Sequence, residues 1–192
     1  MTIFCATSNP GKLREFQLAA LDFDIQPLPR KIPPPEETGD TFAANAIQKA
    51  VYYGQLTPGH LFADDSGLQV DALNGAPGVH SARYAGEHAT DAQNNALLLE
   101  RLAGVKNRTA RFVCSIALVK DGALVKTFGG AVEGEILDAP RGSEGFGYDP
   151  LFYVSSLCRT FGQAVISDKM LLSHRGQAFS AMFTYLRNLS SH

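Results

Sequence analysis

Residues 109–136 read TARFVCSIALVK, then Asp121-Gly122, then ALVKTFGGAVEGEI. In the first of these segments apolar and polar side chains alternate, as they do in a strand that places one face against a core. Asp-Gly is a strong signal for a two-residue hairpin turn, because such turns need positive φ angles at their central positions. The stretch therefore predicts a long antiparallel hairpin, with one strand over 109–119 and the other over about 123–136.

The segment that precedes the hairpin predicts alternating strands and helices. Asn9 is a good N-cap and Pro10 suits the first position of a helix, so a helix should follow an initial buried strand. The expected elements of this half are a strand at 2–7, a helix after Asn9, a helix at about 40–55, a strand at 60–64, a Gly-rich irregular stretch at 66–89 and a helix at about 90–102.

After the hairpin, a Gly/Pro loop is expected over 140–150, a short strand over 151–154 and a last helix from near Ser173. Early alternation of strands and helices, combined with a central antiparallel hairpin, predicts an α/β fold with a mixed sheet rather than a purely parallel one. The length of 192 residues suits one domain that spans 1–192.

Composition excludes some classes of partner. A net charge of −2 argues against a protein that coats a nucleic acid polymer through a basic surface, although it leaves a nucleotide open as a small anionic ligand. The N-terminus lacks a signal-peptide pattern and no apolar run approaches a bilayer span, so no membrane partner and a cytoplasmic location are expected. No pair among Cys5, Cys114 and Cys158 has metal or redox spacing, and Cys5 and Cys114 lie in apolar stretches that look like buried strands, so free thiols in a reducing compartment are expected.

Three polar segments carry the residue types that bind phosphate and metal. Residues 7–12, TSNPGK, place hydroxyl and amide side chains at a helix N-terminus, and Lys12 falls in the first turn, where a phosphate would bind; simple helix capping is the alternative. Glu36-Glu37 precede a helix, whose dipole alone would favour them. Asp64-Asp65 follow an apolar strand, and adjacent carboxylates repel unless a cation lies near them, although an Asx-type turn remains open. Mg²⁺ typically takes one or two carboxylates.

Two further segments carry residue types that bind a base. Residues 145–150, GFGYDP, place glycines beside aromatic rings, which lets a base approach and stack; an aromatic-anchored loop is the alternative. His174-Arg175 begin the last helix, where positive charge is unfavourable, so an anionic or acceptor-rich partner is expected, and a surface carboxylate would also serve. Asn45 and Lys49 are four residues apart and share a polar helix face.

In combination, these segments make the chain resemble the inosine/xanthosine triphosphate pyrophosphatases. The pieces TSNPGK, EETGDTFAANAIQKA, ADDSGLQVDALNGAPGVHSARYAG, GFGYDP and SHRGQA occur in the family's order over nearly the whole chain. The resemblance implies an elongated mixed sheet with flanking helices, in two lobes around a central cleft. It also implies a homodimer and Mg²⁺-dependent hydrolysis of non-standard purine nucleoside triphosphates (those of inosine, deoxyinosine and xanthosine) to the monophosphate and pyrophosphate.

The resemblance also implies roles for individual residues. It implies that Asp65 is the general base and that Lys12 adds a fixed positive charge. The implied metal ligands are Glu37 and Asp65. The implied triphosphate site is Thr7, Ser8, Asn9, Pro10, Gly11 and Lys12. The implied lining of the cleft is Asn45, Lys49 and Ser66. The implied base and sugar site is Phe146, Gly147, Tyr148, Asp149, Lys169, His174 and Arg175.

Three positions depart from the family's pattern. Ala44 stands where the family often has an acidic residue, Gln163 stands where Glu is usual, and Met170 follows Asp168-Lys169 where Asn or Ser is common. These changes bear on substrate preference and metal affinity. Two alternatives stay open: a pyrophosphatase of similar fold that acts on other modified nucleotides, and a nucleotide-binding module without turnover.

Overall fold

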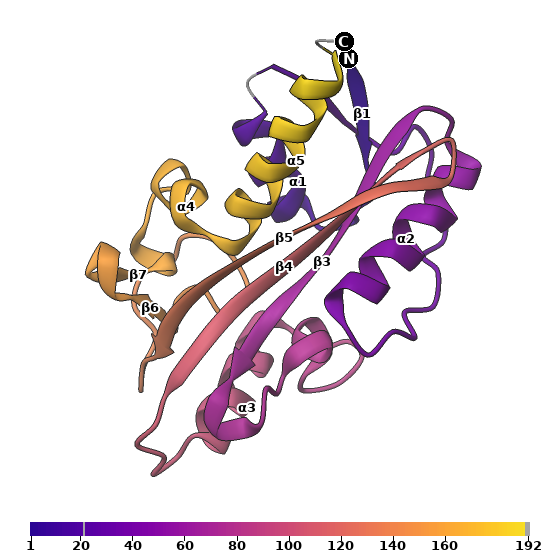
Figure 1. The fold of residues 1–192 in the computed structure, drawn as a ribbon. Helices are drawn as coiled ribbons and strands as arrows, with labels where there is room; N and C mark the ends of the chain where they lie inside the picture. Colours follow the sequence, from indigo (N-terminus) through magenta and orange to yellow (C-terminus); the bar gives the residue numbers. More distant parts are fainter. Residues whose placement is uncertain (21, 191–192) are drawn as a thin grey trace. The chain divides into compact units, whose positions relative to one another are not determined.

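The structure, a computed structural model, describes residues 1–20 and 22–190 and within them forms a seven-stranded sheet with the order β2-β1-β3-β4-β5-β6-β7 (Figure 1). The strands are β1 Thr2–Cys5, β2 Asp24–Pro27, β3 His60–Val70, β4 Thr109–Lys120, β5 Ala123–Ile136, β6 Phe152–Val154 and β7 Arg159–Thr160. β1 pairs in parallel with β2 and β3, whereas β6 pairs antiparallel with β5 and β7. The prediction of a mixed sheet is confirmed.

The α-helices that the structure describes are α1 Pro10–Ala19, α2 Phe42–Leu56, α3 Asp91–Arg101, α4 Ile166–Leu172 and α5 His174–Ser190. Of these, α1, α2 and α3 begin after a residue whose side chain caps them. Asn9 caps α1, since its Oδ1 accepts from the backbone N–H groups of Gly11 and Lys12. Thr90 and Gln93 form a capping box at the start of α3. None of these helices is both long and apolar enough to cross a membrane, within the part of the chain that the structure describes.

The predicted Asp121-Gly122 hairpin turn is confirmed by its backbone angles. Asp121 has φ +50° and Gly122 has φ +79°, as a primed two-residue turn requires. The expectation of an irregular stretch over 66–89 was wrong for its first five residues, because β3 continues to Val70; beyond it the chain forms the short 3₁₀ helices η1 Asp71–Leu73 and η2 Gly78–Arg83. The Ser-Gly pair resembles a turn, but Leu68 and Val70 are fully buried and the Leu68 N–H donates to Ser81 Oγ at 2.9 Å. The sequence did not predict the short elements β2, β7 and α4.

The chain divides into two compact units, and each of β3, β4 and β5 contributes to both. The first unit comprises Met1–Asp65, Cys114–Gly130 and the chain from His174 onward. The second unit comprises Ser66–Val113 and Ala131–Ser173. Its core gathers Leu68, Leu98, Phe112, Phe152 and Phe161, with Phe112 and Phe152 centroids 4.5 Å apart.

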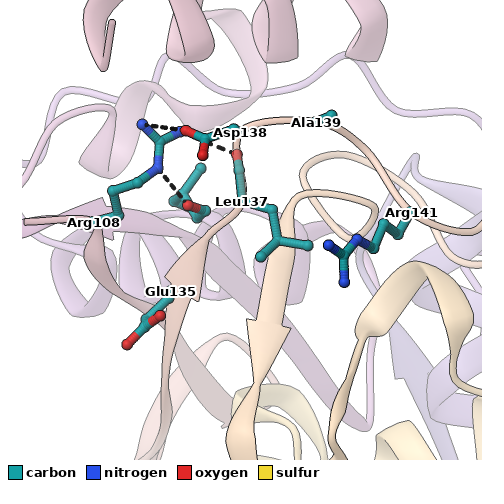
Figure 2. A pocket seen from close by; sticks show the side chains of 7 residues that line it. Arg108, Glu135, Leu137, Asp138, Ala139 and Arg141 are labelled. Atoms are coloured by element: carbon teal, nitrogen blue, oxygen red, sulfur yellow. Dashed lines mark hydrogen bonds and ion pairs between the residues drawn. The ribbon is translucent and has the colours of Figure 1, made fainter. Parts of the chain in front are cut away.

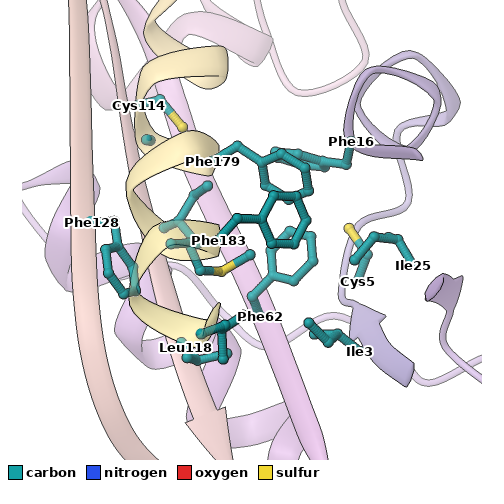
Figure 3. Packing of buried hydrophobic residues seen from close by; sticks show 14 residues of the cluster. Ile3, Cys5, Phe16, Ile25, Phe62, Cys114, Leu118, Phe128, Phe179 and Phe183 are labelled. Atoms are coloured by element: carbon teal, nitrogen blue, oxygen red, sulfur yellow. The ribbon is translucent and has the colours of Figure 1, made fainter. Parts of the chain in front are cut away.

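The first unit has hydrophobic clusters on both faces of its part of the sheet. On one face Phe62 of β3 packs with aromatic side chains of α1 and α5, and Phe16, Phe179 and Phe183 are the largest of these (Figure 3). On the other face its neighbours Leu61 and Ala63 pack with Ala46, Ala50 and Tyr53 of α2. Because successive side chains of a strand point to opposite faces, β3 assigns each following residue to one of these two environments.

Two adjacent glycines of β5 allow a test of how closely α5 packs on the first unit's sheet. A Cβ on Gly130 would lie 2.2 Å from the His174 carbonyl oxygen and 2.8 Å from the Ala178 nitrogen, whereas a Cβ on Gly129 would meet only the Cys114 carbonyl oxygen, at 3.9 Å. Gly130→Ala should lower the free energy of unfolding by about 1–3 kcal/mol, since backbone atoms cannot move aside cheaply.

Gly129→Ala is the matched control and should leave stability within about 1 kcal/mol of the wild type or raise it. Denaturant unfolding of both variants measures the difference. Equal stabilities would contradict the close approach of α5 to β5.

Candidate active site

Asp64 and Asp65 are adjacent in β3 but lie on opposite faces of the sheet. Asp64 follows Phe62 by two residues and faces α1 and α5, while Asp65 follows Ala63 by two residues and faces α2. The strand was expected to end at this pair, and a shared cation was the expected answer to their repulsion. In the structure each carboxylate has a lysine partner of its own, Lys12 for Asp64 and Lys49 for Asp65.

Asp64 lies among buried charges on the α1/α5 face. Its Oδ2 is 2.8 Å from Lys12 Nζ and 3.9 Å from Arg175 Nε, and its side chain is 1% exposed. Arg175 Nη1 also donates to the carboxylate of Glu15, which α1 buries. The sequence predicted an anionic partner for the cations that begin α5. The structure supplies one in Glu15, which is buried rather than at the surface.

Asp65 is held by α2 on the other face. Asn45 Nδ2 donates to Oδ2 at 3.1 Å and Lys49 Nζ donates to Oδ1 at 3.2 Å. Asn45 and Lys49, which the sequence placed on one polar helix face, therefore both contact Asp65. Lys49 Nζ is also 3.2 Å from Glu37 Oε1. Glu37 is placed there because the next residues of its loop are tied to α2, with the Gly39 N–H donating to Asn45 Oδ1 at 2.8 Å.

The two aspartates have oppositely shifted pKa values. Burial alone would raise the pKa of Asp64, but the charges of Lys12, Arg175 and Lys49 outweigh it and lower that pKa to about 2. For Asp65 burial prevails over Lys49 and Lys12, so its pKa is raised above the usual range. Titratable neighbours whose environments separate their pKa values are the usual arrangement in acid–base sites. Asp64 therefore stays ionised near neutral pH, whereas Asp65 binds a proton more readily than an ordinary aspartate does.

The carboxylates of Glu37 and Asp65 fit a divalent cation of the Mg²⁺ type. Both lie 3.2 Å from the ammonium of Lys49, so they converge on a position that already attracts positive charge. Among the described residues no group of three or more His, Cys, Asp or Glu side chains could enclose a metal ion. Mg²⁺ does not need such a cage, because it commonly takes one or two carboxylates together with waters and substrate phosphates.

The turn between β1 and α1 combines capping with a candidate anion site. Thr7 Oγ1 accepts from the Asn9 N–H at 3.2 Å, and Asn9 Oδ1 takes the N–H groups of Gly11 and Lys12 at 2.8 and 3.2 Å. Capping therefore accounts for part of the polar content of this turn. Lys12 differs, because its ammonium reaches across to Asp64 on the sheet.

In the second unit, the segment around Phe146 is built on a buried ion pair. Lys169 Nζ lies 2.5 Å from Asp149 Oδ2 and 5.0 Å from the centroid of the Phe146 ring. The same carboxylate accepts from the Phe146 N–H at 2.9 Å. Burial raises the pKa of Tyr148, so its hydroxyl stays protonated and donates to the Ser81 carbonyl oxygen at 2.8 Å. The ring of Phe146 is half-buried, as a stacking platform would be.

The structure thus places the expected residues in two groups, and each unit holds one. The group of the first unit is Thr7, Ser8, Asn9, Pro10, Gly11, Lys12, Glu37, Asn45, Lys49, Asp65, His174 and Arg175. The group of the second unit is Ser66, Phe146, Gly147, Tyr148, Asp149 and Lys169. Sequence reasoning gave no role to Asp64 or Glu15. The cations that begin α5 were the signal that an acid had to be buried beside them.

A separate hollow of about 290 Å³ lies in the second unit, lined by Arg108, Arg141 and residues 135–139 (Figure 2). The guanidinium of Arg108 is occupied there by contacts within the fold. It donates to the carbonyl oxygens of Leu102, Ile136 and Leu137 and pairs with Asp138 at 3.2 Å. Glu135 and Asp138 also place negative charge on the wall, so this hollow does not resemble a phosphate site.

Fold and site together define an α/β protein with a mixed sheet and a candidate site around two adjacent aspartates of β3. The chain belongs to the Ham1 family, whose profile matches residues 3–185. It is 49% identical over 186 residues to a protein of an Exiguobacterium species named dITP/XTP pyrophosphatase, and the match covers 93% of each chain. Among solved structures it is similar to a HAM1 protein from Coxiella burnetii, with 43% identity, a TM-score of 0.87 and coverage of 98% of this chain and 99% of that one. The Ham1 protein of Staphylococcus aureus is 40% identical with a TM-score of 0.86 and the same coverage.

The opposite pKa shifts predict opposite effects of Asp→Asn substitution on stability. The pKa of Asp64 falls from 3.8 to about 2 on folding, so its charge stabilises the fold above pH 3.8 and that stabilisation is lost as the pH falls through about 2. Asp64→Asn should therefore lower the free energy of unfolding at pH 7 by about 2 kcal/mol or more.

The raised pKa of Asp65 has the reverse sign, because the ionised carboxylate is less favourable in the fold than in the unfolded chain. Asp65→Asn should leave stability at pH 7 unchanged or increase it. Guanidinium unfolding of both variants at pH 7 makes the comparison. A larger loss for Asp65→Asn than for Asp64→Asn would contradict this assignment of the two environments.

Proposed function

We propose that this protein hydrolyses non-standard purine nucleoside triphosphates, those of inosine, deoxyinosine and xanthosine, to the monophosphate and pyrophosphate. Membership of the Ham1 family and relatives named dITP/XTP pyrophosphatase support this activity. The structural observation that carries it is the pair Asp64-Asp65 on opposite faces of β3, with Asp64 paired to Lys12 and Asp65 held by Asn45 and Lys49. Removal of deaminated purines from the nucleotide pool is the role that follows.

In the proposed reaction, Asp65 accepts a proton from the water that attacks the α-phosphorus. A raised pKa suits this task, since a general base works best when its pKa approaches the operating pH. Asn45 and Lys49 keep the carboxylate in one orientation through their bonds to its two oxygens. A binding module without turnover would not need this proton affinity.

Lys12 provides fixed positive charge for the triphosphate at the turn formed by Thr7, Ser8, Asn9, Pro10 and Gly11. Its ammonium is restrained by Asp64, and Asp64 is in turn kept ionised by Lys12 and Arg175. Charge that is oriented before the substrate arrives stabilises the developing negative charge without reorganisation. The pairing therefore converts a flexible lysine into a preorganised one.

Glu37 and Asp65 are the residues that would hold Mg²⁺. When bound, the ion would offset negative charge on the phosphate oxygens. The acidic loop is suited to this because Gly39 and Thr38 anchor it to α2, with the Thr38 N–H donating to Gln48 Oε1 at 3.2 Å.

Discrimination between purine bases is assigned to the Phe146 ring and to side chains that donate hydrogen bonds to the base. Phe146 would stack on the purine, and Gly147 and Tyr148 would shape its loop. Hypoxanthine and xanthine carry a carbonyl at C6, where adenine carries an amino group. Lys169 has only donors, so a carbonyl oxygen satisfies it and an amino group does not. Asp149 holds Lys169 in place, and Ser66 would complete the substrate's surroundings.

A product analysis tests the reaction. Inosine triphosphate should yield the monophosphate and pyrophosphate, measured by chromatography and by phosphate release with and without added inorganic pyrophosphatase. The diphosphate and orthophosphate as products would place the attack elsewhere, and methylated or pyrimidine triphosphates as better substrates would favour a related pyrophosphatase of different specificity.

Asp65→Asn should reduce kcat/KM by at least ~10²-fold, the lower range for a lost general base, while the fold persists. Wild-type kcat/KM in a folded Asp65→Asn variant would remove Asp65 from the mechanism.

We further propose a homodimer that acts in the cytoplasm, where the nucleotide pool lies. The apolar, Gly-rich region 72–86 is the segment of the sequence that suggests an association surface. Light scattering coupled to size exclusion at micromolar concentration should give twice the chain mass of 20.7 kDa. A monomer under those conditions would refute the dimer without affecting the proposed chemistry.

A further inference from the structure

Helix α3 binds the backbone of Gly147, the residue that follows Phe146. Asp91 and Asn95 are four residues apart and so share one face of the helix. Asp91 Oδ2 accepts from the Gly147 N–H at 2.6 Å, and Asn95 Nδ2 donates to the Gly147 carbonyl oxygen at 3.0 Å. Both backbone groups of one residue are therefore bound by one helix face within the second unit.

Gly147 is the residue of this loop that most needs such restraint. Its φ of +61° lies in the left-handed region, and a Cβ there would meet no other atom within 4 Å, so packing does not fix its conformation. Glycine has more backbone freedom than any other residue. Asp149 binds the preceding residue, since its carboxylate accepts from the Phe146 N–H at 2.9 Å and its own N–H donates to the Phe146 carbonyl oxygen at 3.2 Å, but neither contact involves the N–H or the carbonyl oxygen of Gly147.

We propose that Asp91 and Asn95 are positioning residues for base recognition: by binding Gly147 from α3 they set the orientation of the Phe146 ring and so the discrimination between purine bases. This inference rests on the proposed function, because it takes Phe146 as the surface on which the base stacks. Neither side chain touches the base or the reacting phosphate in this assignment. Their effect is expected on substrate binding rather than on the chemical step.

An alternative explanation is purely structural. Asp91 lies in the first turn of α3, where any acidic residue favours the helix dipole. Gln93 offers a control at the same helix end, because it completes the capping box with Thr90 through a bond of 2.8 Å from the Thr90 N–H to its Oε1. Gln93→Ala weakens the start of α3 without removing a contact to Gly147.

The test measures kcat and KM for inosine and adenosine triphosphates in the full-length protein. Loss of both contacts in Asp91→Ala/Asn95→Ala should raise KM for inosine triphosphate about tenfold and narrow the preference over adenosine triphosphate, with kcat within about threefold of wild type. Asp91→Asn keeps an acceptor oxygen and should retain wild-type KM. Gln93→Ala should lower the melting temperature and leave KM and preference unchanged.

Hydrogen exchange gives a second readout that does not depend on turnover. The amides of residues 146–149 should exchange faster in the double variant than in the wild type or in Gln93→Ala. A double variant that matches Gln93→Ala in KM, preference and exchange would overturn the positioning role. Absence of inosine triphosphate hydrolysis by the wild type would instead overturn the proposed function, while the exchange comparison would still decide whether α3 restrains the loop.

Discussion

The alternation of side chains along β3 is the constraint on which the candidate site depends. Phe62 and Asp64 point to one face of the sheet, and Ala63 and Asp65 to the other. Each aspartate therefore meets a different helix and a different set of cations. One strand thereby supplies a fixed anion and a proton acceptor from neighbouring positions, and a shift of register by one residue would exchange their environments.

Buried charge on the α1/α5 face is tolerated because every member has a partner. Lys12, Glu15, Asp64 and Arg175 alternate in sign around the first turns of the two helices. Removing one member would leave an uncompensated charge in a region of low exposure, which costs far more than the loss of a surface ion pair. Such a network fixes the positions of α1 and α5 on the sheet, and the Lys12 ammonium with them. Its value lies in defined geometry more than in net stability.

In the second unit, the loop around Phe146 is restrained mainly by hydrogen bonds to its backbone. The aromatic ring at its tip is half-buried, and specific hydrogen bonds to Asp149, Ser81 and α3 restrain the residues on either side. Backbone contacts of this kind can position a side chain without covering it. They also leave the ring's exposed surface available to a planar ligand.

By itself, the sequence determined the class of fold, the long helices and the hairpin, because caps, Asp-Gly turns and periodic patterns are local signals. The roles of the candidate site residues came from the family resemblance and stay a prediction. The sequence misjudged the length of β3, since the burial of Leu68 and Val70 overrides the turn preference of Ser66-Gly67. Only the tertiary structure decided that Asp64 and Asp65 have different partners, that Glu15 pairs with Arg175, and that α3 binds Gly147. Those contacts join residues far apart in the chain, and no local pattern encodes which acid a distant cation will meet.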